Sequence, residues 1–323
     1  MTRTDCPLCG TRATFTLKGT HTDAGVRYDL YECSECTGQF FEPLKNPGAS
    51  WYEHDERYAG RNESPILEPQ WNHTQAIDYF GSKTGTVLDV GCGVGNFLAY
   101  AESKGWKGVG IDFDHDAIEA GKKTFGLTEL SVADIHQFRN SNSGKQFNLV
   151  TFFDVLEHID DHKEFMEDVR ALVATGGHIA MSMPHRAHAA FLMPADAPPR
   201  HLTRWDEKSL KVFLNRFGFD VVHMKSKGEG IRFIILKLRF KYGRSLSMGL
   251  VNKVSGPVGK KTEQMKLRIA LAKGLALVKD TLIFGIPALL IWLALLPTRK
   301  RYVSLFAIAR LREAANGQAK KRV

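Results

Sequence analysis

Between residues 84 and 226, short apolar stretches alternate with stretches that have the periodicity of helices, and this alternation restricts the fold more than any other feature. Strands separated by helices predict a parallel sheet with helices packed on both of its faces. The expected strands are 86–90, 109–112, 130–133, 147–153, 178–183 and 219–224, followed by a last strand at 302–310. We therefore expect an α/β protein.

About 75 residues separate the sixth and seventh expected strands. A connection of that length is too long for a plain loop, so it should have structure of its own. We expect three parts, which are an N-terminal unit at 1–44, a main domain at 45–226 that a strand at 302–311 completes, and a basic, apolar helical insert at 227–300.

The N-terminal unit contains two C-x2-C pairs, Cys6 with Cys9 and Cys33 with Cys36. A tight turn of this kind presents two thiolates to one ion, and two such turns complete the tetrahedral set that zinc prefers. Short strands between the pairs would carry them in a zinc ribbon, a unit too small to fold without its metal. The set leaves no ligand position open, so we expect structural zinc. The alternative is two unrelated pairs of free thiols.

Glycine and acidic residues follow four successive expected strands, which is where ligands bind to open α/β sheets. A G-x-G-x-G turn after the first strand lets the backbone approach a ligand closely, and the acid before it could bind an amino group. The acid after the second strand lies where carboxylates bind ribose hydroxyls, and the acid after the third could accept from an adenine amino group. Each acid could instead cap a helix or lie in a solvated loop. The candidate cofactor-binding residues are Asp89, Gly91, Gly93, Gly95, Asp112, Asp134, Ile135 and Asp154.

Three segments carry a family resemblance, namely 87–95 (VLDVGCGVG), 109–112 (VGID) and 153–158 (FDVLEH). They resemble class I S-adenosylmethionine-dependent methyltransferases. The resemblance implies a Rossmann-like seven-stranded sheet whose last strand is antiparallel and lies between the fifth and the sixth. It also implies that the glycine turn holds the methionine part of S-adenosylmethionine, that Asp112 binds the ribose and that Asp134 binds the adenine.

Segment 154–158 differs from the Asn/Asp-Pro-Pro-aromatic loop with which related enzymes methylate amino groups of nucleobases or glutamine amides. That difference argues against a nucleobase acceptor. The zinc ribbon together with Pro198–Trp205 (PPRHLTRW) is similar instead to a subgroup that acts in sugar and secondary-metabolite pathways. We therefore expect O- or C-methylation of a small-molecule, sugar or lipid-linked acceptor.

Methyl transfer from a sulfonium to an alcohol or a carbon acid requires removal of the acceptor's proton. His158 lies just after the fourth expected strand, and imidazole titrates near neutral pH, so this residue is the first candidate for the base. His185 and His201 are further candidates, and each histidine could instead pack against a helix. Glu157 and His158 could also help to hold a divalent ion.

Charge is divided unevenly along the chain. Residues 1–224 carry a net charge of −9 and residues 225–323 carry +18, while the sixteen residues 281–296 contain no charge at all. A helix of that length is too short for a hydrocarbon core of roughly 30 Å, and the strand that follows must return to the sheet. These features predict peripheral attachment to an anionic membrane. The alternatives are a buried helix hairpin or a dimer interface.

Two other function classes fit parts of the sequence. A protein directed to nucleic acid could use the ribbon and the basic tail as contacts, but the basic residues flank an apolar stretch that nucleic acid would not cover. A catalytically inactive protein that binds the cofactor is the other class. The first residues contain no apolar run, so the expected location is the cytoplasm, at the membrane surface. The pattern does not indicate an oligomeric state.

Overall fold

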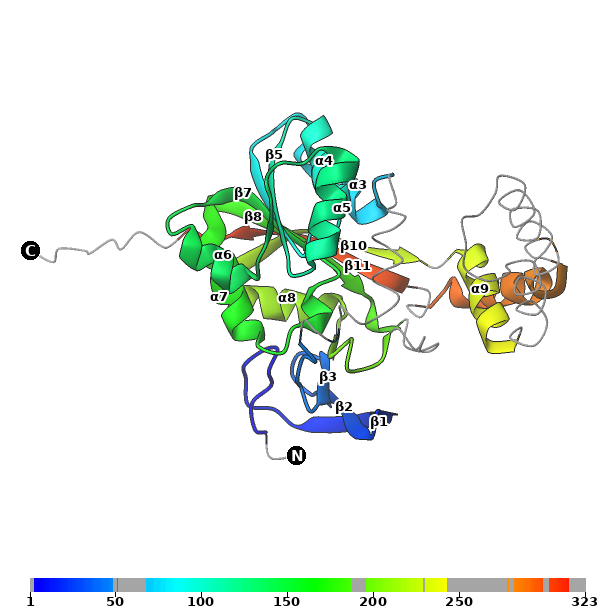
Figure 1. Cartoon of the computed structure of the whole chain (residues 1–323). Helices are drawn as coiled ribbons and strands as arrows, with labels where there is room; N and C mark the ends of the chain where they lie inside the picture. The colour runs from blue at the N-terminus through cyan, green and yellow to red at the C-terminus, as the bar shows by residue number, and fades with distance from the viewer. Residues whose placement is uncertain are drawn as a thin grey trace, which may run out of the picture. The chain divides into compact units, whose positions relative to one another are not determined.

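The computed structural model describes residues 3–48, 51, 68–187, 196–228, 230–242, 278, 282–298 and 302–313. The chain divides into two compact units (Figure 1). The first combines Met1–Ser226 with Ser304–Val323, and the second is Lys227–Val303. The first unit contains both cysteine pairs and every candidate cofactor-binding and catalytic residue.

A seven-stranded sheet forms the centre of the first unit, in the order β10-β11-β8-β7-β4-β5-β6. Neighbouring strands from β8 to β6 are parallel, whereas β11 runs antiparallel to β8. This order confirms the expected Rossmann-like sheet, with an antiparallel last strand between the fifth and the sixth. The strands are β4 (Thr86–Val90), β5 (Lys107–Asp112), β6 (Leu130–Val132), β7 (Phe147–Phe153), β8 (Val173–Pro184), β10 (Phe219–Gly228) and β11 (Tyr302–Leu311).

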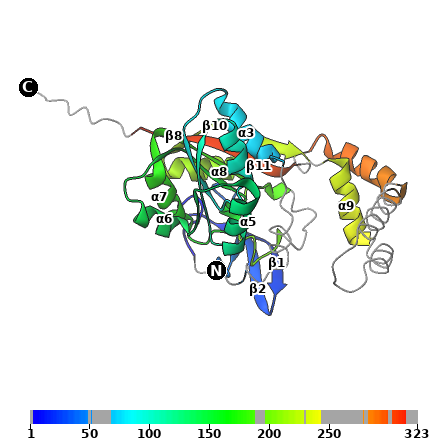
Figure 2. The same cartoon turned by 45° about the horizontal axis from the view of Figure 1, so that its top comes forward.

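Helices cover both faces of this sheet (Figure 1 and Figure 2). One cluster of buried side chains joins α3, α4 and α5 to the sheet, and a second cluster joins α6, α7 and α8 to it. Central strands such as β7 are apolar on both faces because both faces are covered. The helices are α3 (Trp71–Phe80), α4 (Asn96–Ser103), α5 (His115–Phe125), α6 (Ile135–Ser141), α7 (His162–Leu172) and α8 (Glu207–Arg216).

Aspartates determine where four of these helices begin. Each accepts a hydrogen bond from a backbone N–H group of the first turn, which no residue inside the helix could satisfy. Such a cap stabilises a helix by about 1 kcal/mol. The capping residues are Asp114 for α5, Asp134 for α6, Asp161 for α7 and Asp206 for α8.

A second sheet, in the order β1-β2-β3-β9, forms most of the N-terminal unit, with Cys33 at the end of β2. Its fourth strand was not predicted, because β9 comes from the segment before α8 and follows β3 after about 160 residues. Phe40 pairs with Thr203, and the N–H of Phe41 donates to the carbonyl oxygen of Leu202 at 2.8 Å. The N-terminal four-cysteine unit, called the ribbon below, is therefore joined to the main domain by a sheet. The strands are β1 (Phe15–Asp23), β2 (Val26–Cys33), β3 (Gln39–Glu42) and β9 (Thr203–Arg204).

The second unit contains α9 (Ile231–Tyr242) and a helix at 282–295, which continues through Pro287. Within the expected helical insert, residues 243–277, 279–281 and 299–300 lie outside the described residues. Several large apolar side chains of the helix at 282–295 are exposed. Within the described part of the chain, no helix combines the length and the apolar character needed to cross a membrane.

Candidate active site

The glycine turn after β4 consists of three residues with positive φ, which are Gly91 at 73°, Gly93 at 53° and Gly95 at 78°. A Cβ atom at Gly91 would lie 2.7 Å from a methyl group of Val155, and one at Gly95 would collide with Leu127. A Cβ atom at Gly93 would meet no atom of the protein within 4 Å. Packing therefore requires glycine at the two outer positions, whereas the central position leaves backbone open to a ligand.

Asp112 ends β5 and holds this turn in place. One carboxylate oxygen accepts from the N–H of Gly93 at 2.8 Å, and the other accepts from the N–H of Asp114 at 2.9 Å. Burial raises the pKa of Asp112 above its ordinary value. Each carboxylate oxygen has a further lone pair, so the side chain can accept from two hydroxyl groups while it keeps both backbone bonds.

Asp89 is a buried acid within β4, two residues before the turn. Its Oδ1 accepts a hydrogen bond from the hydroxyl of Thr151 at 2.6 Å. Burial raises the pKa of Asp89 to about 7, against the effect of that bond, and the nearby charge of Asp112 adds to the rise. A cationic amino group beside this carboxylate would lower its pKa again.

Asp134 and Ile135 begin α6 at the end of β6. Asp134 caps the helix, because its side chain accepts from the N–H of Gln137 at 2.8 Å and the Gln137 side chain accepts from the N–H of Asp134 at 3.3 Å. Ile135 is buried in the core together with Phe138. Both residues thus have structural roles at the strand end where the sequence places adenine contacts.

Asp154 follows β7 in a left-handed conformation, with φ at 55°, which is uncommon for a residue other than glycine. Its N–H donates to the carbonyl oxygen of Ser182 at 2.8 Å, and the hydroxyl of Ser182 donates to Oδ1 of Asp154 at 3.1 Å. The amide of Asn72 donates to the same hydroxyl at 2.9 Å. Asn72 and Ser182 were not identified from the sequence, because they lie 110 residues apart and belong to no motif.

Glu157, His158 and His201 come together beside this strand end. Glu157 and His158 lie in the short 3-10 helix η1 (Leu156–His158), and His201 lies just before β9. The N–H of Leu202 donates to the carbonyl oxygen of Glu157 at 2.7 Å, which joins the two segments. The two imidazole rings meet edge to face, with centroids 4.8 Å apart. One ligand atom from each of the three residues lies within 4.8 Å of the other two.

The carboxylate of Glu157 is only 1% exposed, and neither of its oxygens has a hydrogen-bond partner among the described residues. Burial raises its pKa well above the ordinary value, and the charge of Asp154 raises it further. A buried carboxylate in such surroundings is stable only when it is protonated or paired with a cation.

Three charged residues in or just before segment 198–205 were not predicted. Asp196 lies 3.5 Å from Nδ1 of His201. Arg200 is buried, with its guanidinium 5.8 Å from the ring centroid of Trp51. Arg204 is buried over Phe41, and burial lowers its pKa to about 10. The pattern of the segment did not indicate which of its side chains would be buried.

His185 does not join the other two candidate histidines. It is buried, its Nδ1 accepts from the N–H of Ala187 at 3.0 Å, and its Nε2 lies 3.2 Å from the carboxylate of Glu207. Because Nδ1 accepts, Nε2 must carry the proton that it donates to Glu207. In this tautomer His185 has no nitrogen with which to take a proton from an acceptor.

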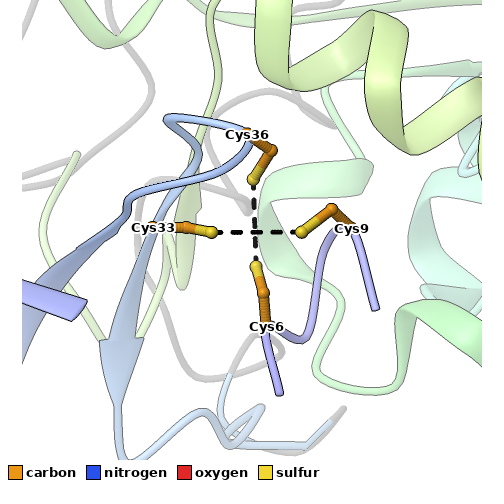
Figure 3. A group of neighbouring side chains, drawn as sticks. All are labelled: Cys6, Cys9, Cys33 and Cys36. Carbon is orange, nitrogen blue, oxygen red and sulfur yellow. Dashed lines mark hydrogen bonds between the residues drawn. The ribbon is translucent and has the colours of Figure 1, made fainter. Parts of the chain in front are cut away.

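The four cysteines of the ribbon converge on one point (Figure 3). Sγ of Cys6 lies 3.8 Å from Sγ of Cys36, and Sγ of Cys9 lies 3.9 Å from Sγ of Cys33. Four sulfurs that surround zinc at about 2.3 Å form a tetrahedron with edges of roughly 3.8 Å. All four side chains are buried, and burial raises the pKa of Cys33 to about 11. The donor set fits zinc, which would supply the positive charge that four buried thiolates need.

Arg186 joins the ribbon to the main domain. Its guanidinium lies 3.1 Å from the carboxylate of Glu32 and 3.0 Å from that of Asp206, and it also donates to the carbonyl oxygen of Thr37. A second contact is made by Arg216 at the C-terminal end of α8, which donates to the carbonyl oxygen of Leu8 at 3.0 Å. The ribbon is thus bonded to both ends of α8, the helix that directly follows β9.

Comparison with known proteins identifies the family to which the chain belongs. Residues 57–224, just over half of the chain, match the family described as methyltransferase domain. The chain belongs to this family. The matched part includes the glycine turn, all four candidate cofactor-binding acids and the three candidate histidines, whereas the ribbon and the basic C-terminal part lie outside it. The protein is an S-adenosylmethionine-dependent methyltransferase, with S-adenosylmethionine as the methyl donor.

Individual relatives of the methyltransferase are distant. Ubiquinone biosynthesis O-methyltransferase from Actinobacillus pleuropneumoniae is 25% identical over 160 residues, which are 47% of this chain and 67% of that protein. The protein of the same name from Haemophilus ducreyi is 25% identical over 151 residues, or 45% of this chain and 63% of the relative. The chain thus spans about two thirds of the length of these relatives. The crystal structure of a SAM-dependent methyltransferase from Archaeoglobus fulgidus is 16% identical, with a TM-score of 0.47 over 80% of this chain and 99% of that one.

Proposed function

We propose that the protein transfers a methyl group from S-adenosylmethionine to an oxygen or carbon atom of a small-molecule, sugar or lipid-linked acceptor. The meeting of His158 and His201 beside the end of β7 carries this proposal, since groups that could accept a proton then lie next to the strand ends that would bind the cofactor. The names of the relatives from Actinobacillus and Haemophilus describe O-methylation, which agrees with an oxygen acceptor.

Roles for the cofactor-binding residues follow from their positions. The backbone at Gly91, Gly93 and Gly95 would hold the methionine part, and Asp89 would pair with its amino group. Asp112 would accept from the ribose hydroxyls. At the next two strand ends Asp134 and Ile135 would contact the adenine, and Asp154, which is fixed by Ser182, would complete the site.

S-adenosylmethionine supplies an electrophilic methyl group on a positively charged sulfur. The protein must hold the acceptor oxygen in line with the carbon–sulfur bond and remove the proton of the hydroxyl. Nδ1 of His158 lies 2.7 Å from the carbonyl oxygen of Arg200 and must donate to it, which leaves Nε2 as the basic nitrogen. His158 would take the hydroxyl proton there as the oxygen–carbon bond forms and the carbon–sulfur bond breaks. The products are the methylated acceptor and S-adenosylhomocysteine.

Two measurements test this function. Calorimetry should show binding of S-adenosylmethionine to the protein and at least tenfold weaker binding to Asp112→Ala, because the ribose hydroxyls lose their acceptor. Transfer of a radiolabelled methyl group should favour phenols, sugars or lipid-linked hydroxyls over amines. Binding of a nicotinamide dinucleotide in place of S-adenosylmethionine, or transfer to amines alone, would overturn the proposal.

We propose further that 1–44 is the zinc ribbon, that 45–226 with 302–311 is the catalytic domain, and that the insert at 227–300 attaches the protein to anionic membranes without spanning them. The support is the exposed apolar face of the helix at 282–295 together with the basic residues that flank it. Burial of each large apolar side chain contributes about 1.5–3 kcal/mol, and each nearby Lys or Arg adds roughly 1 kcal/mol. The exposed side chains are Leu282, Ile283, Ile286, Leu289, Leu290, Leu293 and Leu296.

Flotation with liposomes tests the attachment. The full chain should float with anionic liposomes, less so in high salt, because salt screens the charges but not the apolar contacts. The double variant Ile286→Glu/Leu290→Glu should stay at the bottom of the gradient and still bind S-adenosylmethionine. Leu17→Glu, which changes an exposed leucine of the ribbon, is the matched control and should float. Equal behaviour of all three proteins would favour a buried hairpin or a dimer interface.

A further inference from the structure

The side chain of Glu157 is a buried acid without a hydrogen-bond donor among the described residues. A buried carboxylate without hydrogen-bond donors costs free energy. Most buried polar groups in proteins therefore have a hydrogen-bond partner. The atoms within reach are instead nitrogens of two imidazole rings, those of His158 and His201.

The imidazole of His158 is held in the way that metal-binding histidines are held, and that of His201 has a carboxylate near its Nδ1. Nδ1 of His158 lies 2.7 Å from the carbonyl oxygen of Arg200, and Nδ1 of His201 lies 3.5 Å from the carboxylate of Asp196. A histidine that binds a metal generally donates its other ring N–H to a backbone carbonyl or a carboxylate, which fixes the ring and directs the basic nitrogen to the ion. The partner is a backbone carbonyl for His158 and a carboxylate for His201.

The donor set decides which ions fit. One carboxylate and two imidazoles suit divalent transition metals, and their ligand atoms lie within 4.8 Å of one another, so that side-chain rotations bring them to one ion. Three protein ligands leave coordination positions open, as in catalytic metal sites. The four-cysteine site has no such position.

We propose that Glu157, His158 and His201 bind one divalent transition-metal ion, and that its open coordination positions take the hydroxyl oxygen of the methyl acceptor. The binding of the acceptor hydroxyl to the metal rests on the proposed function and deepens it. In the metal-bound protein His158 is a ligand and no longer the base, and coordination lowers the pKa of the acceptor hydroxyl so that its proton passes to solvent. The resulting alkoxide or phenolate attacks the methyl carbon.

Mn²⁺ is the probe of choice, because carboxylate oxygen is a ligand that suits it and because it does not compete with zinc for four thiolates. Full-length protein with its ribbon zinc in place should bind one Mn²⁺ per chain. The loss of the free-ion signal in electron paramagnetic resonance measures this binding. Glu157→Gln should weaken this binding by at least tenfold, since it removes a ligand and keeps the side-chain volume. Asp196→Asn should weaken it roughly tenfold through the ring orientation of His201.

His115→Asn is the control, because His115 is an exposed histidine at the start of α5 beside an acid, Asp116. It should bind Mn²⁺ as the unaltered protein does. The zinc content and the affinity for S-adenosylmethionine of each variant establish that it is folded. Mn²⁺ should also raise the melting temperature of the unaltered protein and not that of Glu157→Gln.

Absence of Mn²⁺ binding, or equal binding by Glu157→Gln and the unaltered protein, would overturn the site. Full methyl transfer after removal of the second ion, with ribbon zinc retained, would overturn its role with the acceptor. Mn²⁺ binding at Glu157 without transfer to any acceptor would instead confirm the site and refute the proposed function.

Discussion

The described residues contain two groups of potential metal ligands, and they differ in almost every respect. The cysteine group lies within the ribbon, has four sulfur donors and is closed around one point. The group of Glu157, His158 and His201 lies at the end of a sheet strand, has nitrogen and oxygen donors and offers only three of them. A closed set stabilises a fold, whereas an open set can hold a substrate.

The difference also shows what local sequence can reveal. Two residues separate the cysteines within each pair, so a turn brings them together before any other part of the chain has folded. Glu157 and His201 are 44 positions apart, and only the path of the chain over the sheet brings them together. The two groups are nevertheless connected, because β9 pairs with β3 and directly follows the segment of His201.

Removal of a ribbon cysteine should have the largest effect. Cys36→Ser should lose the zinc ion and several kcal/mol of stability, because a structural metal contributes its binding free energy to folding. We expect the melting temperature to fall by roughly 10 °C. Mn²⁺ affinity at Glu157 should fall as well, since β9 loses its neighbour.

Metal analysis and calorimetry measure both effects. Cys92→Ser changes the buried cysteine outside the ribbon and should keep one zinc per chain. If Cys36→Ser retained its zinc and its stability, the assignment of the first group as a structural site would be wrong.

Gly93→Ala should separate the cofactor site from both metal groups. The new methyl group meets no protein atom, so it should project toward the cofactor and reduce affinity for S-adenosylmethionine by more than tenfold. Zinc content should not change. Gly126→Ala is the matched control, because Gly126 also has a positive φ, at 70°, and no neighbour within 4 Å. Each variant should lose about 1 kcal/mol of stability from the backbone, and only Gly93→Ala should lose the cofactor.

Asp89 should link cofactor binding to pH. Its pKa of about 7 lies above the ordinary value of 3.8, so its contribution to the stability of the free protein is lost as pH rises through 7. Pairing with a cationic amino group favours the charged form. Affinity for S-adenosylmethionine should therefore rise about tenfold between pH 6 and pH 8.

Calorimetry in two buffers of different ionisation enthalpy should detect the proton released at pH 6. Asp89→Asn should bind more weakly and with little dependence on pH over this range. An unaltered pH profile in Asp89→Asn would exclude Asp89 as the partner of the amino group.

Arg186→Met should have the smallest effect and tests the connection between the two groups. The variant loses the ion pairs with Glu32 and Asp206, which are partly exposed, so the expected loss of stability in urea is about 1 kcal/mol. Zinc should remain bound, while Mn²⁺ affinity should fall about threefold. Lys18→Met, which removes a more exposed partner of Glu32, should leave Mn²⁺ affinity unchanged.

Much of the fold was accessible from sequence, because its signals are local. The apolar stretches at β4 and β7 and the resemblance around the glycine turn predicted the seven-stranded sheet and its antiparallel last strand, which the structure confirms. β9 was not predictable, since two residues carry no periodicity and their partner strand is remote.

The candidate site could be predicted only in part, because its residues pair over long distances. His185 and His201 were both candidates for the base, yet the first donates to Glu207 and the second lies beside Glu157. Asn72 is linked to Asp154 through the hydroxyl of Ser182. Burial and pairing of this kind depend on the packed fold and not on spacing.

The pairing of β3 with β9 also has a consequence during synthesis. The first three strands of the ribbon leave the ribosome early, but the strand that covers the β3 edge follows after about 160 residues. At about 5–20 residues per second, that edge waits on the order of 10 to 30 s for its partner. An unpaired strand edge is a template for association with other chains. The nascent protein should therefore be most prone to aggregate in this interval, and early zinc capture would hold the ribbon's strands in their folded arrangement until β9 arrives.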